Sequence, residues 1–149
     1  EILKIRIKNL LETRRKLKIS FQNDLGINTD DIASNSKDKE FLDRVVSIIM
    51  DRLSDPDFNV NELSTTVLMS RTHVRRKLKA LTDQTTVDFI RTIRLKESIS
   101  LLKTNKYSVA EVSYMTGFGT PSYFTSMFKK QYNVTPMEFL KKTEAKKSV

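Results

Sequence analysis

Residues 58–63 read FNVNEL and residues 107–112 read YSVAEV, so one pattern of apolar and cap-forming residues occurs twice, 49 positions apart. The match continues beyond these hexapeptides at an offset of 50, because one extra residue falls in the turn of the second copy. The continued matches are the pairs Val74–Phe124 and Leu78–Phe128. Self-similarity of this kind predicts a fold that is built from two related units.

Each copy opens with a capping-box pattern, Asn59 with Glu62 and Ser108 with Glu111. In such a box the cap side chain accepts from a free helix amide, and the glutamate reaches back to the cap. A short helix, a tight turn and a second helix are then expected in each copy. The turns are residues 68–70 and 117–120, and the glycines of the second turn supply positive φ. The sequence therefore predicts two helix-turn-helix units, over residues 59–82 and 108–132.

A long helix over residues 86–103 is expected to join the two units. About 18 residues of helix span about 27 Å, so this element can act as a rigid spacer. Its wide apolar face consists of Phe89, Ile90, Ile93, Leu95, Ile99 and Leu102. A last helix over residues 136–142 begins with Thr135 as cap and Pro136 in the first turn, and Glu138 closes a third box. A frayed basic tail is expected after Lys141.

Three segments precede the repeat. Residues 2–22 are basic with apolar residues at heptad-like spacing, which predicts a helix. That helix can be a connector, a dimer seam or a membrane-surface helix. Residues 23–37 are polar and are interpreted as a linker. A further helix begins near Asp38 and is stopped by Asp55-Pro56-Asp57. Its apolar face is Phe41, Leu42, Val45, Val46, Ile49 and Leu53.

The predicted fold is thus all-α: two helix-turn-helix units joined by a long linker helix, preceded by a basic N-terminal helix. The two units and the linker helix fall in one expected domain over residues 38–149. The composition agrees, with 38% hydrophobic and 30% charged residues and only three glycines and three prolines. No apolar run approaches the ~20 residues needed to span a bilayer. The chain starts at Glu1 without a signal-peptide pattern, and we interpret it as a fragment of a longer protein.

The charge balance indicates an anionic partner. The formal net charge is +9 and the pI is about 9.8, which suits nucleic acid or an anionic membrane surface. The chain has no cysteine, so it can form neither disulfides nor thiolate metal sites. Its only histidine, His73, cannot make a zinc site alone. We expect no metal and no cofactor.

The second helix of the first unit is the strongest candidate for DNA contact. Ser70 is its expected cap, Val74, Leu78 and Leu81 point inward, and Lys77 lies at the side. The outer faces carry the candidate contacts Arg71, Thr72, His73, Arg75, Arg76 and Lys79. Arginine matches the O6 and N7 acceptors of guanine, so this face suits base reading. The alternative is a merely solvated charged face, and His73 can equally be a neutral surface residue.

The second helix of the second unit has a different face. Phe124, Phe128 and Met127 are expected to pack inward. The candidate contacts are Thr120, Pro121, Ser122, Thr125, Ser126 and Lys129. One charge and three hydroxyls discriminate bases less sharply than arginine. We therefore expect this helix mainly to position the duplex, with Thr120 and the first helix amides holding a phosphate.

No group of residues points to catalysis. Nothing places a serine, a histidine and an aspartate together, and the aspartates lack calcium-loop spacing. The Gly117-x-Gly119 pair is too short to cradle a nucleotide phosphate. We therefore expect no enzyme activity in this fragment.

Residues 58–142 resemble the AraC/XylS family of bacterial transcription regulators. The run from Gly117 to Pro136 is similar to the family signature GF-x-x-x-SYF-x-x-x-FK-x-x-x-G-x-TP. Arg94-Leu95 with Leu101-Leu102 fits the linker-helix pattern, and residues 70–78 fit the first recognition helix. The resemblance implies a cytoplasmic transcription activator that binds double-stranded DNA and contacts RNA polymerase.

Three positions depart from the family pattern. Asn133 replaces a glycine, and asparagine is the next-best residue for a left-handed cap. Ser126 replaces a common Arg or Lys, which argues against strong base reading by the second helix. Leu140 replaces an arginine.

Residues 6–17 resemble the last helix of a response-regulator receiver domain and its outgoing linker. This resemblance implies a hybrid two-component protein, in which a sensor kinase and a receiver precede the DNA-binding domain. Histidine kinase activity and an inner-membrane anchor would then lie upstream of this chain. Two chains could pair through residues 2–22 or through the upstream domains. The alternative function is a basic helical adaptor for an acidic protein or a membrane surface.

Overall fold

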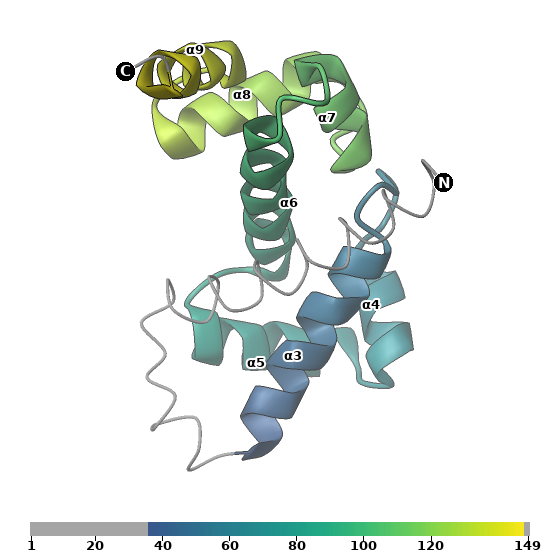
Figure 1. The fold of residues 1–149 in the computed structure, drawn as a ribbon. Coiled ribbons are helices and arrows are strands. Elements are labelled where there is room, and N and C mark those ends of the chain that lie inside the picture. Colours follow the sequence, from purple (N-terminus) through teal and green to yellow (C-terminus); the bar gives the residue numbers. More distant parts are fainter. Residues whose placement is uncertain (1–35, 148–149) are drawn as a thin grey trace, which may run out of the picture. The chain divides into compact units, whose positions relative to one another are not determined.

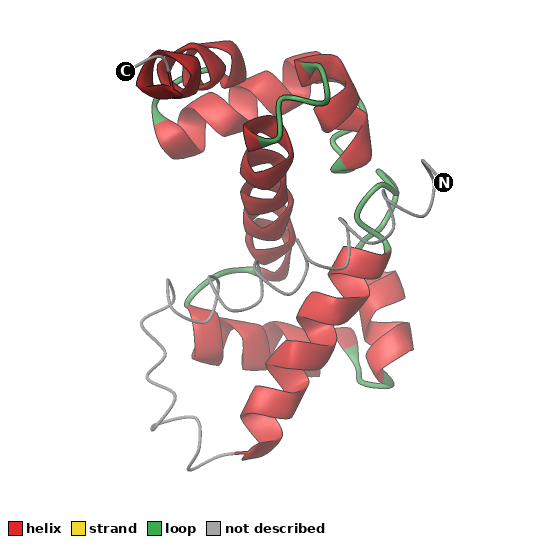
Figure 2. Ribbon diagram, in the orientation of Figure 1, coloured by secondary structure: helices red, strands yellow, loops and turns green. Residues whose placement is uncertain are grey.

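The computed structural model describes residues 36–147, so the predicted helix over residues 2–22 and most of the predicted linker lie outside the described residues (Figure 1). All regular elements within residues 36–147 are helices (Figure 2), which confirms the all-α class. They are α3 (Ser36–Asp51), α4 (Val60–Val67), α5 (Arg71–Thr82), α6 (Thr86–Lys103), α7 (Val109–Met115), α8 (Pro121–Tyr132) and α9 (Pro136–Lys147).

The chain divides into two compact units. Unit 1 contains α3, α4, α5 and the first part of α6, through Ile93. Unit 2 contains α6 from Arg94 onward, the helices α7 to α9, and the short segment Leu53–Asp57. Each unit therefore holds one of the two helix-turn-helix pairs, α4–α5 or α7–α8.

Unit 1 is held together by α3, which packs against α4 and α5 (Figure 1). Its inner face buries all the predicted apolar residues that lie within the helix, with Val45 and Ile49 fully inaccessible. At the rim, Arg44 Nη2 donates to the Thr66 carbonyl oxygen at 3.2 Å, near the end of α4. Lys77 Nζ of α5 lies 3.6 Å from Asp38 Oδ1 and 4.8 Å from the centre of the Phe41 ring. Polar contacts therefore fasten α3 to both helices of the first pair.

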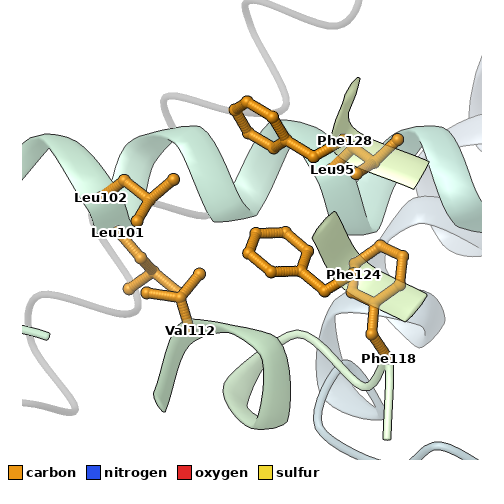
Figure 3. Close-up of a cluster of buried hydrophobic side chains, with 7 residues drawn as sticks. All are labelled: Leu95, Leu101, Leu102, Val112, Phe118, Phe124 and Phe128. Atoms are coloured by element: carbon orange, nitrogen blue, oxygen red, sulfur yellow. The ribbon is translucent and has the colours of Figure 1, made fainter. Parts of the chain in front are cut away.

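Unit 2 is built around a cluster of apolar and aromatic side chains (Figure 3). The rings of Phe124 and Phe128 are fully buried, with centroids 5.7 Å apart in an edge-to-face arrangement. Such aromatic pairs add stability beyond the area that they bury. The other members of the cluster are Leu95, Leu101, Leu102, Val112 and Phe118. The ring centroids of Phe139 in α9 and Phe128 lie 5.8 Å apart, so the last helix packs on this core.

Two helix ends differ from those predicted. Helix α9 continues to Lys147 instead of ending at residue 142, and Phe139 and Leu140 pack against the core from its first half. Helix α3 ends at Asp51, four residues before the Asp55-Pro56 sequence that was expected to stop it. Leu53 is buried as predicted, but it lies beyond the helix, in the segment that belongs to unit 2.

Candidate nucleic-acid interface

The first helix-turn-helix pair is shaped by its caps. The Asn59 side chain accepts from the amides of Asn61 and Glu62 at 2.9 and 3.2 Å, and so begins α4. The bond from the Glu62 amide is the first half of the predicted box, and the Glu62 carboxylate also binds Arg52 Nη2 at 3.0 Å. An arginine within reach is a stronger partner for a carboxylate than a neutral backbone amide.

The turn of the first pair has no glycine. Leu68 adopts the left-handed conformation with φ 60°, and its side chain is 84% exposed. The Met69 amide donates to the Ser64 carbonyl oxygen at 3.0 Å, which closes the end of α4. Ser70 then caps α5 by accepting from the His73 amide at 3.1 Å. The turn therefore positions α5 even though leucine is an unfavourable residue for this backbone conformation.

Helix α5 presents its predicted contact residues to solvent. Val74 and Leu78 are fully buried and define the inner side of the helix. At 3.6 residues per turn, Arg76 lies on the side of the helix opposite Val74 and Leu78. Thr72 lies on the same outer side, one turn before Arg76. All six candidates of this helix are exposed: Arg71, Thr72, His73, Arg75, Arg76 and Lys79.

The basic residues of α5 differ in how they are held. Arg71 Nη1 donates to Asn61 Oδ1 of α4 at 2.9 Å, and Lys79 forms an exposed ion pair with Asp83 at 3.5 Å. Lys77 is half-buried against α3, which agrees with its predicted place at the side. Within the part of the chain that the structure describes, no ion pair engages Arg75 or Arg76. These two guanidinium groups are thus available to an incoming anion.

The second helix-turn-helix pair has a complete capping box and a glycine-rich turn. Ser108 Oγ accepts from the Glu111 amide at 3.1 Å, and Glu111 accepts from the Ser108 amide at 3.3 Å, as predicted. The turn contains Gly117 at φ 77° and Gly119 at φ 82°, on either side of buried Phe118. Thr120 caps α8 by accepting from the Tyr123 amide at 3.2 Å.

Four of the six predicted contact residues of α8 are exposed. Thr120, Ser122, Ser126 and Lys129 are exposed, whereas Pro121 and Thr125 are half-buried. Thr125 flanks the inner side of the helix, so its hydroxyl is less open than expected. The predicted inward positions of Phe124 and Phe128 are confirmed, and Met127 packs partly against the same core.

Two exposed residues of α8 lie outside the predicted contact set. Lys130 is exposed and falls on the same stripe as Ser122 and Ser126, which are spaced four residues apart. That spacing could have identified it. Tyr123 is 44% exposed, and its ring lies 5.8 Å from that of Phe118. The face therefore carries two lysines and an aromatic hydroxyl in addition to its serines.

The two outer faces occupy equivalent places but have different chemistry. At the offset of 50, Arg76 corresponds to Ser126 and Thr72 corresponds to Ser122. A guanidinium fork can bind two acceptors of one guanine, whereas a serine hydroxyl bonds to many groups. Lysine ammonium groups near either helix can neutralise phosphates.

Other kinds of site find no support among the described residues. No group of three or more His, Asp or Glu side chains within residues 36–147 is placed to hold a metal ion. None of the helices in this range is both long and apolar enough to cross a bilayer. His73 is exposed on α5, beside the candidate contacts.

Comparison with known proteins supports the interpretation of this geometry. A family model described as a helix-turn-helix domain matches residues 63–142. The DNA-binding domain of AdpA, solved in complex with a target DNA, has a TM-score of 0.65 and 28% identity. That match covers 70% of this chain and 94% of the AdpA chain.

Two curated relatives are longer proteins. Histidine kinase P4 of Formosa agariphila is 38% identical over 136 residues, which are 91% of this chain and 10% of that protein. Transcriptional activator PerA of Escherichia coli is 30% identical over 121 residues, which are 81% of this chain and 43% of PerA. The chain thus spans less than half the length of either relative.

Proposed function

The chain belongs to the AraC-type helix-turn-helix family of DNA-binding transcription regulators, and from that premise we propose that it is the output domain of a longer two-component protein. The observation that carries the proposal is the duplicated pair of helices, each with an exposed polar face on its second helix. In α5 that face is rich in arginine, which suits the reading of base edges in a major groove.

We propose that α5 and α8 enter successive major grooves on one face of the duplex. Successive grooves lie about 34 Å apart, one helical turn of DNA. The 18-residue helix α6 runs between the two pairs and has a length that suits this spacing. Operators for this domain would then consist of two short sequence elements about one turn apart.

In this proposal α5 mainly discriminates bases and α8 mainly contacts phosphates. Arg75 and Arg76 supply most base discrimination, because arginine forms paired hydrogen bonds with guanine. Lys129 and Lys130 contact phosphates, and the exposed N-terminal end of α8 at Thr120 holds another phosphate. The serine hydroxyls of α8 adjust to several bases.

The two-component context rests on one relative and one resemblance. The match to histidine kinase P4 spans 91% of this chain, and residues 6–17 resemble the end of a receiver domain. We propose that a sensor kinase and a receiver precede this chain, and that the DNA-binding part works in the cytoplasm even if the whole protein is membrane-anchored. Activation through RNA polymerase, and pairing of two chains through residues 2–22 or upstream domains, belong to the same proposal.

Selection of duplexes from a random library tests the DNA-binding proposal. The 149-residue chain should enrich duplexes with a common sequence, and a gel shift should show tighter binding to them than to random DNA. Affinity should fall steeply with salt, because phosphate contacts release counterions. Equal binding to selected and random duplexes would instead favour a basic adaptor, the alternative that the comparisons do not favour.

A further inference from the structure

A buried arginine joins three separate segments of unit 2. Arg94 of α6 is 6% exposed, and its guanidinium donates to the carbonyl oxygen of Gly117 in the turn between α7 and α8. Its Nη2 also donates to the carbonyl oxygen of Asp55 at 2.9 Å. The segment Leu53–Asp57 belongs to unit 2, although it connects two helices of unit 1. One side chain thus ties this segment to the second helix-turn-helix.

The turn at Gly117 is packed tightly against this arginine. A Cβ added at Gly117 would lie 2.8 Å from Arg94 Cζ and closer still to the Leu53 carbonyl oxygen. Gly119 has a similar φ, but a Cβ added there would meet only Pro56 Cβ, at an ordinary 3.7 Å. The backbone at Gly117 therefore has little freedom to shift while Arg94 and residues 53–57 stay in place.

A charged residue at this position is costly. Burial lowers the pKa of the Arg94 guanidinium below its ordinary value, while the electrostatic interaction with Asp55 opposes that shift. Burial of a charge is repaid only when its hydrogen bonds are well made. A leucine or methionine would fill a core position on α6 without this penalty. Packing of the core alone therefore does not account for arginine here.

The described part of unit 1 has an exposed bond from Arg44 to the Thr66 carbonyl at the end of α4, but no buried arginine that bridges its turn. At the offset of 49, Val45 corresponds to Arg94 and Leu68 corresponds to Gly117. Val45 is an apolar residue with no accessible surface, and the Leu68 side chain is 84% exposed, so no arginine at that place holds the first turn. The bridge is a feature of the second helix-turn-helix.

We propose that Arg94 is a positioning residue, which sets the direction in which α8 leaves its turn and hence how that helix meets DNA. Gly117 lies three residues before Thr120, the cap of α8, so a shift of the turn moves the start of the recognition helix. The inference rests on the proposed use of both recognition helices. It assigns to a buried residue of α6 the control of how the second recognition helix meets DNA.

The test compares Arg94→Met and Arg94→Lys with Arg91→Met. Methionine retains much of the arginine stem, and lysine retains the charge but has a single ammonium group that cannot bridge two carbonyls. Arg91 lies on the same helix, is half-buried and pairs with Asp88 at 3.2 Å, so its substitution controls for loss of an α6 arginine. All four tyrosines lie at positions 107–132, in unit 2, and the chain has no tryptophan. The near-UV circular dichroism of tyrosine can therefore verify that unit 2 is folded in each variant.

The probes are duplexes selected by the unsubstituted chain, with a random segment of about 30 base pairs to accommodate two elements one turn apart. Because the chain has no cysteine, a single cysteine at Ala80 or at Gln131 can carry an iron chelate. Cleavage of the DNA then shows which element lies beside α5 and which beside α8. Each element is scrambled in turn to make two further probes.

Both Arg94 variants should bind the intact duplex about tenfold or more weaker, which corresponds to about 1.4 kcal/mol. On the probe with the α8 element scrambled, both Arg94 variants should bind with the same affinity as the unsubstituted chain. The Arg91→Met variant should have the affinity of the unsubstituted chain on every probe. An equal loss on all probes, or no loss on the intact duplex, would overturn the inference. Failure of the unsubstituted chain to select any duplex would overturn the proposed function itself, and this inference with it.

Discussion

Replacement of Gly117 by alanine offers a direct measure of the Arg94 bridge, because Gly119 provides a matched control two residues away. Both glycines have positive φ, 77° and 82°, so an alanine at either position carries a similar backbone penalty. That shared cost is about 1–2 kcal/mol for an L-residue. The environments of the two positions differ, since only the Cβ at Gly117 would collide with Arg94 and the Leu53 carbonyl.

The additional cost at Gly117 follows from what must move. The Leu53 carbonyl oxygen and the Arg94 guanidinium both have to give way to the new methyl group. Either movement separates Arg94 from the turn and from segment 53–57, which breaks its hydrogen bonds to the carbonyls of Gly117 and Asp55. Hydrogen bonds from a charged donor contribute about 1.5–3 kcal/mol each, so Gly117→Ala should be roughly 3–6 kcal/mol more destabilising than Gly119→Ala. That is a large fraction of the ~5–15 kcal/mol by which most domains are stable.

Urea denaturation should be followed by tyrosine fluorescence and by far-UV circular dichroism together. Tyrosine emission reports unit 2 alone, since all four tyrosines lie there, whereas far-UV dichroism reports all helices. The tyrosine transition should shift to much lower urea in Gly117→Ala and only moderately in Gly119→Ala. If the two variants differ by less than about 1 kcal/mol in free energy of unfolding, the bridge contributes little and the reasoning is refuted.

Four further substitutions test other parts of the structure. Arg76→Ala should cost about 1–3 kcal/mol on the selected duplex and relax its specificity; an equal loss on random DNA would mean that Arg76 contacts only phosphate. Lys129→Ala should weaken binding to all sequences alike and reduce the salt slope by about one, so a changed base preference in selection would contradict our assignment of α8. Leu68→Gly should raise the free energy of unfolding by roughly 0.5–1 kcal/mol, because it relieves an exposed left-handed leucine; a lower melting temperature would contradict this. Phe128→Ala should cost about 3–5 kcal/mol in the tyrosine-monitored transition, since the ring is fully buried, and a cost below 1 kcal/mol would show that the core tolerates its loss.

Much of the fold could be predicted because its signals are local. Helix caps act within three residues, and apolar spacing reflects the 3.6-residue turn, so the sequence alone indicates where α5 and α8 begin and which faces they bury. The exposed contact residues of α5 could be predicted because Val74 and Leu78 fix which side of that helix is buried. Lys130 was overlooked although its spacing from Ser126 was available.

One difference from the predictions arose where a partner from elsewhere in the chain competes with a local pattern. Glu62 has the spacing of a capping box, yet Arg52, ten residues earlier, binds its carboxylate. Local propensity is a weak guide when such tertiary contacts are available. The extension of α9 beyond residue 142 has a different origin, because its residues are mostly exposed and none is a glycine or proline that would end the helix.

Periodicity and capping, which depend on near neighbours along the chain, determined that this protein has two helix-turn-helix units with a basic and a hydroxyl-rich outer face. Only the tertiary structure decided that Arg94 bridges Gly117 and Asp55, partners 23 and 39 residues away. It also decided that residues 53–57 belong with unit 2. Contacts of this kind arise when distant segments are packed together, and no pattern within one helix specifies them.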